Sequence, residues 1–286
     1  MITQVAKKDH AQMLISKKGG QNMNYLKKQY NTLKVTVSDG IAVIQFNRPE
    51  AMNAANIEMS FERLEVYSGV SQDPEVKVVI VTGNEKAYCA GGDLVAFSQF
   101  DVSQAQEFGL RGLEYQKVLM DMPKPTIAAV AGFAFGGGME NVLLCDLRIA
   151  ADNAKFALPE INVGIFPGGG ATQRLVQNVS ICKAKELIFL GEAMNAEQAY
   201  ETGLINKVVP LESLMDEAMN WAKKLCKKPP LSLGVAKSLI NHAWGTSIHE
   251  GIHAEVKAWA TIYSTADQTE GMQAFLEKRK PVFMGK

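Results

Sequence analysis

The sequence predicts an α/β fold in which buried strands alternate with helices, followed by a purely helical region. Two continuous apolar runs bounded by turn residues, "KVVIVTG" (77–83) and "PTIAAVAG" (125–132), are typical of strands buried on both faces. Helical patterns around 57–70 and 102–121 separate the strands and indicate an α/β layer rather than a β-sandwich. From about residue 211 the pattern is helical alone.

The stretch "LKVTVSDGIAVIQFN" (33–47) predicts a β-hairpin. Two alternating runs rich in β-branched residues flank Asp39-Gly40, and an Asp-Gly pair in this setting is the strongest short-range hairpin signal. We therefore expect the folded domain to begin at residue 33.

The first 22 residues differ from the rest of the chain. They show no strand alternation and carry four lysines against one acid, Asp9. This composition predicts a disordered basic extension over residues 1–32. A transit peptide is the alternative interpretation, but the stretch contains no arginine.

The remaining chain divides into two predicted parts. Residues 33–205 form an α/β core, and residues 206–286 form a helical region in which Pro229-Pro230 separates two helical patterns.

Composition limits the classes of partner. The chain has 286 residues, of which 47% are apolar, so it can bury a large core. Its 30 basic and 30 acidic side chains give a formal net charge of zero, which provides no long-range field toward nucleic acid or an anionic membrane. No run approaches the roughly 18–20 apolar residues that span a bilayer. We expect neither nucleic acid nor a membrane as a partner.

The cysteines predict a reducing environment. They lie far apart with no CxxC spacing, which favours free thiols and a cytoplasmic location. They are Cys89, Cys145, Cys182 and Cys226. Because no histidine lies near Cys89 in sequence, we expect it to fill space in the core rather than to act as a nucleophile.

The carboxylate of Glu140 lies directly after the glycines in the apolar, glycine-rich stretch "AGFAFGGGMENVLLCDLRIA" (131–150). A strand that ends at Gly132, a glycine turn and a helix-forming run place Glu140 in the first turn of a helix. The helix dipole alone would favour an acid there, but such an acid normally faces water. Its apolar and glycine neighbours instead indicate a site where backbone approaches a ligand.

A second carboxylate follows in "FALPEINVGIFPGGGATQRL" (156–175). Glu160 is followed by another glycine-rich turn, and a helix is expected to begin near Ala171. Two such carboxylates predict a general acid and base pair that acts on one water or one carbon centre. Neither turn matches a nucleotide-binding glycine motif.

The segment "KAYCAGGDL" (86–94) supplies small residues directly after a strand and a loop. Such residues let main-chain N–H groups point into a cavity, which is how an oxyanion hole is built.

These motifs resemble the crotonase family, the enoyl-CoA hydratase and isomerase superfamily, over roughly residues 33–286. The matching stretches are "NRPEAMNA", "AYCAGGDL", "AVAGFAFGGGMENVLLCDLRIA", "FALPEINVGIFPGGGATQRL", "AEQAYETGLINKVV" and "EGMQAFLEKRKPVF". The resemblance implies a spiral of ββα units and a C-terminal helical region that builds homotrimers or hexamers formed from two trimers.

The resemblance also implies roles for individual residues. Glu140 and Glu160 match the two catalytic glutamates of enoyl-CoA hydratases, which hold one water between them. The backbone N–H groups of Ala90 and Gly137 match the oxyanion hole that polarises the thioester carbonyl. Removal of one such donor typically costs about 3–4 kcal/mol of transition-state stabilisation.

A wider set of residues is implied to bind the acyl-CoA substrate. Asp93, which belongs to this set, is also expected to order a turn, as is Asp146. The set comprises Ala51, Met52, Ala90, Gly91, Gly92, Asp93, Leu94, Gly136, Gly137, Pro159, Gly168, Phe275 and Lys278. Coenzyme A would be part of the substrate, and no separate cofactor is expected.

The implied reaction is hydration of a 2-enoyl-CoA. Retention of both glutamates and Gly168, where dienoyl-CoA isomerases carry Asp, favours hydratase over isomerase. Other crotonase-family chemistry, namely cyclic enoyl-CoA hydration, decarboxylation or hydrolysis, stays open because fold does not fix reaction. A remote alternative is an acyl-CoA-binding relative without catalysis.

One motif points elsewhere. "HEGIH" (249–253) fits the zinc pattern H-E-x-x-H, and Glu270 or Glu277 could complete a site. Gly251 weakens the helix that the pattern requires, and we expect no metal site.

Overall fold

The computed structural model describes residues 24–286, and its first two strands form the predicted hairpin. Strand β1 (Leu33–Ser38) pairs antiparallel with β2 (Ile41–Phe46). Asp39 and Gly40 both have positive φ, 52° and 77°, as the tight turn of a two-residue hairpin requires.

The described residues contain a six-stranded main sheet in the order β1-β2-β3-β5-β7-β10. The strands after the hairpin are β3 (Val78–Thr82), β5 (Thr126–Val130), β7 (Leu147–Ala151) and β10 (Lys207–Val209), and they pair in parallel. Every residue of β3 and β5 is buried, which explains their continuous apolar runs.

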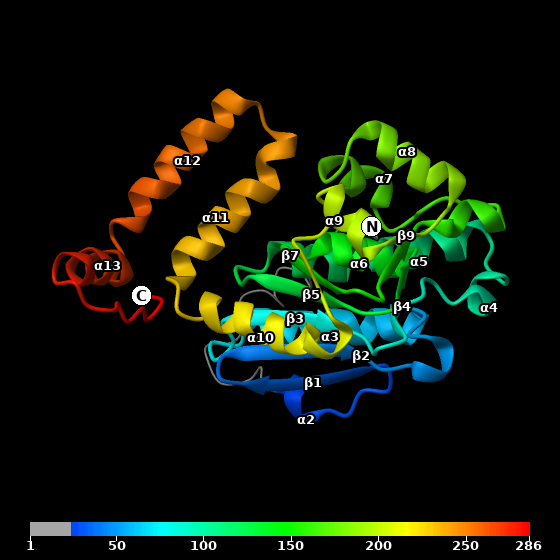
Figure 1. Ribbon diagram of the computed structural model, residues 1–286, viewed down its shortest axis with the longest axis horizontal. Helices are drawn as coiled ribbons and strands as arrows, with labels where there is room; N and C mark the ends of the chain where they lie inside the picture. The colour runs from blue at the N-terminus through cyan, green and yellow to red at the C-terminus, as the bar shows by residue number, and fades with distance from the viewer. Residues whose placement is uncertain (1–23) are drawn as a thin grey trace, which may run out of the picture.

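Helices cover both faces of this sheet (Figure 1). Strand β3 alternates, with Val79 and Val81 facing one hydrophobic cluster and Val78 and Ile80 the other. The first cluster lies under α3 (Ile57–Gln72), α5 (Val102–Asp121) and α6 (Gly137–Leu144). The second is covered by α10 (Leu214–Leu225), which buries Leu214, Ala218 and Ala222 at four-residue spacing.

A second sheet has the order β4-β6-β8-β9. Its strands are β4 (Ala87–Cys89), β6 (Phe133–Phe135), β8 (Lys155–Ala157) and β9 (Met194–Asn195). Each of β3, β5 and β7 is followed by a strand of this sheet, so the chain winds through successive ββα turns. The predicted α/β spiral is confirmed.

Short helices connect these turns. They are η1 (Pro49–Ala51), α4 (Leu94–Phe97), η2 (Pro159–Val163), α7 (Ala171–Arg174), η3 (Leu175–Gln177), α8 (Ile181–Leu190), α9 (Ala196–Glu201) and η4 (Leu211–Ser213).

The last helices extend away from both sheets (Figure 1). They are α11 (Pro230–His242), η5 (Ala243–Gly245), α12 (Ile248–Ile262) and α13 (Ala266–Leu276). Because α10 is part of the core, the separate helical region begins at α11 and not at residue 206. This region exposes large apolar side chains, among them Ile248 at 81% and Trp259 at 60%.

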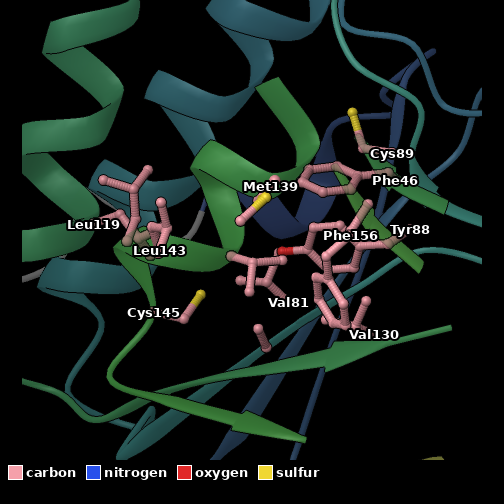
Figure 2. Packing of buried hydrophobic residues seen from close by; sticks show 14 of the residues in the cluster. Phe46, Val81, Tyr88, Cys89, Leu119, Val130, Met139, Leu143, Cys145 and Phe156 are labelled. Carbon is pink, nitrogen blue, oxygen red and sulfur yellow. The ribbon is translucent and has the colours of Figure 1, made fainter. Parts of the chain in front are cut away.

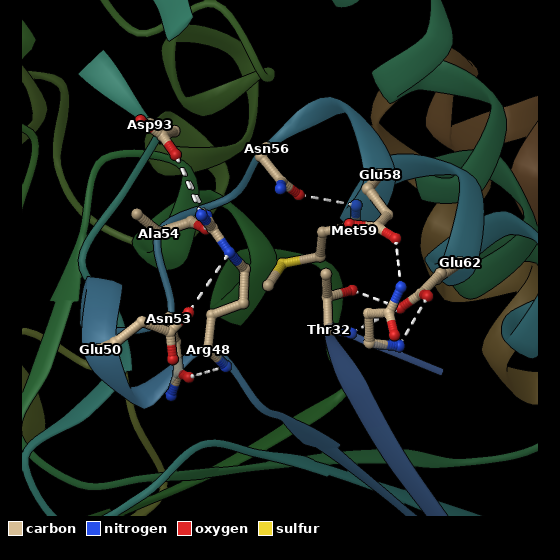
Figure 3. A network of polar contacts seen from close by, with 11 residues as sticks. Thr32, Arg48, Glu50, Asn53, Ala54, Asn56, Glu58, Met59, Glu62 and Asp93 are labelled. Atoms are coloured by element: carbon tan, nitrogen blue, oxygen red, sulfur yellow. Dashed lines mark hydrogen bonds and ion pairs between the residues drawn. The ribbon is translucent and has the colours of Figure 1, made fainter. Parts of the chain in front are cut away.

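The predicted extension over residues 1–32 is wrong for its last part. Residues 24–32 include α2 (Asn24–Lys27) and pack on the core, with Tyr25 3% exposed and its hydroxyl donating to Asp73 at 2.7 Å. The backbone N–H of Thr32 donates to Glu62 of α3 at 2.9 Å (Figure 3). Residues 1–23, where the basic stretch lies, are outside the described residues.

The four cysteines are free thiols, and Cys89 is fully buried in the larger cluster (Figure 2). In the part of the chain that the structure describes, no helix has both the length and the apolar character to cross a bilayer.

Candidate active site

The N-terminus of α6 is the centre of the site. Gly136 precedes the helix with φ 49°, a conformation that favours glycine. Gly138 lies so close to the β4 strand that a Cβ there would be 2.0 Å from the carbonyl oxygen of Cys89. Glu140 occupies the first turn, as predicted, and is 6% exposed. The glycines therefore allow the start of α6 to press against the segment that follows β4.

The Glu140 carboxylate is held by the second glycine-rich turn. Its Oε1 accepts backbone N–H groups from Gly169 at 2.8 Å and Ala171 at 3.1 Å. Burial raises the pKa of Glu140, while these two N–H groups and the nearby Arg174 lower it in part. Arg174 in turn donates to the carbonyl of Gly169 at 2.8 Å. Glu140 is thus a fixed acceptor held by two backbone N–H donors.

Glu160 reaches the same place from η2. A Cβ built on Gly136 would be 2.9 Å from Glu160 Oε1, so this carboxylate lies beside the start of α6. Its Oε2 is buried and has no hydrogen-bond partner among residues 24–286. Burial raises the pKa of Glu160 to about 7; its own backbone N–H opposes this rise, and the charge of Glu140 adds to it. The structure therefore brings the two predicted glutamates together with different environments.

The oxyanion-hole prediction needs one correction. The N–H of Ala90 already donates to the carbonyl of Met52 at 3.0 Å, so it is not available to a substrate. The N–H of Gly92 makes no hydrogen bond to any described residue, and that of Gly137, the first residue of α6, has no acceptor within its helix. A Cβ built on Gly137 would be 3.9 Å from the Gly92 nitrogen, which places these two backbone segments side by side. The structure therefore offers the N–H of Gly92, rather than that of Ala90, as the candidate partner of Gly137.

Hydrogen bonds from Arg48 hold the segment that carries Gly92 in place. The Arg48 guanidinium donates to Asp93 Oδ2 from two nitrogens at 3.2 Å each, and the Arg48 backbone N–H donates to Asn53 Oδ1 at 2.8 Å (Figure 3). Asp93 is thus engaged by Arg48 and orders the turn. Sequence reasoning missed Arg48, although it lies in the motif "NRPEAMNA".

The other predicted substrate-binding residues lie in segments that adjoin Gly92, Glu160 or Gly169. Met52 is tied to the Gly92 segment through the Ala90 N–H, and Ala51 ends η1 beside it. Leu94 begins α4 and is 54% exposed. Pro159 is the residue before Glu160, and Gly168 adjoins Gly169 with open space around it.

Two predicted residues are not brought to the site within one chain. Phe275 is 81% exposed on α13, and Lys278 follows that helix. Figure 1 shows α13 at the far end of the molecule from α6. A contact between these residues and the site would require a second copy of the chain.

The zinc pattern forms an exposed pair only. His249 and His253 lie on α12 with ring centroids 4.6 Å apart. In the range 24–286, no three His, Cys, Asp or Glu side chains are grouped so that they could hold a metal ion.

Comparison with known proteins agrees with this geometry. The family model "Enoyl-CoA hydratase/isomerase" matches residues 36–286. The chain is 40% identical to a crotonyl-CoA hydratase of Syntrophomonas wolfei over 90% of this chain and 99% of that protein. It is also 40% identical to a short-chain-enoyl-CoA hydratase of Clostridium acetobutylicum over 84% of this chain and 92% of that protein.

Solved structures show the same fold. The crystal structure of an enoyl-CoA hydratase from Bacillus anthracis matches with a TM-score of 0.86 and 34% identity, covering 90% of this chain and all of that one. The predicted resemblance and the hydro-lyase class are confirmed. The chain belongs to the enoyl-CoA hydratase/isomerase family, and within it the named relatives support enoyl-CoA hydratase activity.

Proposed function

We propose that this protein adds water reversibly across the 2,3 double bond of short-chain 2-enoyl-CoA thioesters. One observation carries the proposal: the carboxylates of Glu140 and Glu160 lie close together near the start of α6, next to two backbone N–H groups, of Gly92 and Gly137, that have no acceptor among the described residues. A thioester oxygen bound to both N–H groups would draw electrons from the double bond and make its β-carbon electrophilic.

In the proposed reaction, Glu140 acts as the base and Glu160 as the acid. Water attacks the β-carbon and passes one proton to Glu140, and the electrons of the double bond form an enolate held by the two N–H groups. The α-carbon then takes the proton of Glu160, which completes the 3-hydroxyacyl-CoA. A proton returns from Glu140 to Glu160 to reset the pair. Two N–H donors favour ionised Glu140, whereas the orphan Oε2 favours protonated Glu160.

The substrate supplies its own coenzyme A, and the mechanism uses no other cofactor. We propose that the pantetheine and nucleotide run past Ala51 and Met52, with Leu94, Pro159 and Gly168 lining the site. In this proposal Phe275 and Lys278 contact the nucleotide of another protomer within a homotrimer or a dimer of trimers. Exposed apolar side chains on α11–α13 support such an assembly. We propose the cytosol as its compartment.

The direct test is loss of the conjugated-thioester absorbance when the purified protein is mixed with crotonyl-CoA. Rapid loss with formation of 3-hydroxybutyryl-CoA is expected. Turnover of a 3-enoyl-CoA, a cyclic enoyl-CoA or a carboxylated acyl-CoA in place of crotonyl-CoA would assign isomerase, ring hydratase or decarboxylase chemistry instead. Release of free thiol would indicate a hydrolase, and tight binding without any turnover would indicate the non-catalytic alternative.

The rate is expected to fall as the pH rises through about 7. The active state holds one proton on the glutamate pair, and Glu160, whose pKa is about 7, loses that proton on the basic side. Because hydration consumes neutral water, its equilibrium does not depend on pH, so dehydration must follow the same profile. Above about pH 7, we expect kcat/KM for hydration and for dehydration to drop roughly tenfold per pH unit. A profile that is flat between pH 6 and 9 would contradict the assignment.

A further inference from the structure

Arg63 is a buried cation for which the proposed reaction has no direct use. It lies on α3, is 1% exposed, and its Nη1 donates to the Tyr115 hydroxyl at 3.3 Å. Its Nη2 contacts the Met59 sulfur at 3.0 Å, and its Nε has no partner among the described residues. No carboxylate within residues 24–286 pairs with it. A buried charge without a counter-ion is costly and calls for an explanation.

Aromatic rings keep Arg63 charged. The guanidinium carbon lies 4.4 Å from the Phe46 ring centroid and 5.3 Å from that of Tyr115, which are cation–π distances. Burial lowers the pKa of Arg63, but the pKa of a guanidinium lies so far above neutrality that the side chain stays protonated. Arginine therefore carries a full positive charge here at any pH the protein tolerates.

Ring contacts connect this charge to the segment that carries Gly92. The Phe46 ring is 5.2 Å from the Tyr88 ring, and Tyr88 and Cys89 lead directly into the segment that carries Gly92. Figure 2 shows Phe46, Tyr88 and Cys89 gathered beside α6. Since Gly138 of α6 packs against the Cys89 carbonyl, this chain of contacts from Arg63 reaches both backbone segments of the proposed oxyanion hole.

The polar groups around Arg63 continue toward the catalytic helix. Tyr88 donates to Asn141 Oδ1 at 2.6 Å, and Asn141 directly follows Glu140. The Asn141 Nδ2 and the Tyr67 hydroxyl are buried beside each other in the same region. A folding requirement alone would favour apolar side chains at such positions, because burial of polar groups costs free energy.

We propose that Arg63 is a positioning residue for the oxyanion hole: its fixed charge, connected through Phe46 and Tyr88 to the Cys89–Gly92 segment, favours the state in which the thioester oxygen is negative. The inference rests on the proposed function. A charge of this kind is present before the substrate arrives and needs no reorganisation during the reaction, which is the condition under which electrostatic stabilisation is most effective. It acts through the protein and touches no reacting atom.

The test compares Arg63→Met with Arg63→Lys in the full-length protein. Met removes the charge, keeps an unbranched flexible side chain and suits the apolar rings, so we expect a thermal midpoint close to that of the wild type. We expect kcat for crotonyl-CoA hydration to fall about tenfold with KM within roughly twofold, because the lost stabilisation belongs to the transition state. Arg63→Lys should retain most of kcat. Tyr115→Phe removes only the hydrogen bond to Arg63 and should also retain most of kcat.

A spectroscopic readout separates polarisation from a structural role. The absorbance of bound cinnamoyl-CoA shifts to the red as its carbonyl is polarised, and this shift should be clearly smaller in Arg63→Met than in the wild type. Wild-type kcat and wild-type shift in a folded Arg63→Met protein would overturn the proposal. If that variant does not fold, Arg63→Lys and Arg63→Gln replace it, and equal kcat values in these two would overturn the proposal in the same way. A wild-type protein that neither hydrates crotonyl-CoA nor shifts the chromophore would instead reject the proposed function.

Discussion

Replacement of Glu160 by Gln is expected to lower kcat for hydration by about 100-fold or more while the protein stays folded. Gln cannot deliver a proton to the α-carbon, and general acid catalysis contributes about this factor. Glu140→Gln should lose a similar factor because the amide cannot take the proton from water. Loss of crotonyl-CoA absorbance under saturating substrate measures both effects. An exposed acid, Glu192, offers a matched control, and Glu192→Gln should keep wild-type kcat.

The two glutamate variants should differ in stability, which tests their separate roles. Glu160 has a raised pKa in the folded state, so the stability linked to its proton is present at low pH and is lost as the pH rises from about 4.5 through about 7. Glu160→Gln stays neutral and should therefore raise the thermal midpoint at pH 8. Glu140→Gln removes a carboxylate that two N–H groups bind, so its thermal midpoint at pH 8 should rise less than that of Glu160→Gln. Equal midpoints for both variants at pH 8 would contradict the different environments of the two acids.

Elements defined by local signals were predictable from the sequence. Helix α5 begins where predicted because Asp101 and Gln104 form a capping box that fixes its first turn. The hairpin at Asp39-Gly40 followed from turn chemistry, and the buried strands followed from their continuous apolar runs. Both glutamates were recognisable because a charge among glycines and apolar residues is poorly explained by folding alone.

Features that depend on distant contacts were not predictable. The choice between Ala90 and Gly92 is decided by one hydrogen bond, from the Ala90 N–H to the Met52 carbonyl, and no local pattern reveals it. Arg63 resembles a surface charge within "FERLEV", and only the rings of Phe46 and Tyr115 show that it is buried.

The same limit applies at the two ends of the described chain. From the sequence alone, residues 24–32 were predicted to be part of a disordered extension. The hydrogen bonds of Tyr25 and Thr32 to α3 and its C-terminal turn, which come from distant residues, show that they are folded. The C-terminal residues expected at the nucleotide lie apart from the site in one chain, so their role depends on assembly, which a single sequence does not specify.

Gly169→Ala is expected to lower kcat about as much as Glu140→Gln does, roughly 100-fold, although it leaves every catalytic side chain in place. A Cβ at position 169 would lie 2.2 Å from Glu140 Oε2, so either the carboxylate must turn away or the turn must move back. Both movements break the hydrogen bonds from the Gly169 and Ala171 N–H groups that hold the Glu140 carboxylate. A shift of the carboxylate by about 1 Å is sufficient to lose its alignment with the reacting water. The expected signature is a low kcat with a nearly unchanged KM and thermal midpoint.

Gly168→Ala adds the same methyl group one residue earlier, where it would meet no protein atom within 4 Å. Any effect of this neighbour should appear in KM, because the space beside it is open to substrate. Comparison of Gly169→Ala with Gly168→Ala therefore distinguishes a steric clash with the Glu140 carboxylate from a steric clash with the substrate. Equal losses of kcat in both variants would mean that the turn acts as a whole and that the position of Glu140 is not what limits the reaction.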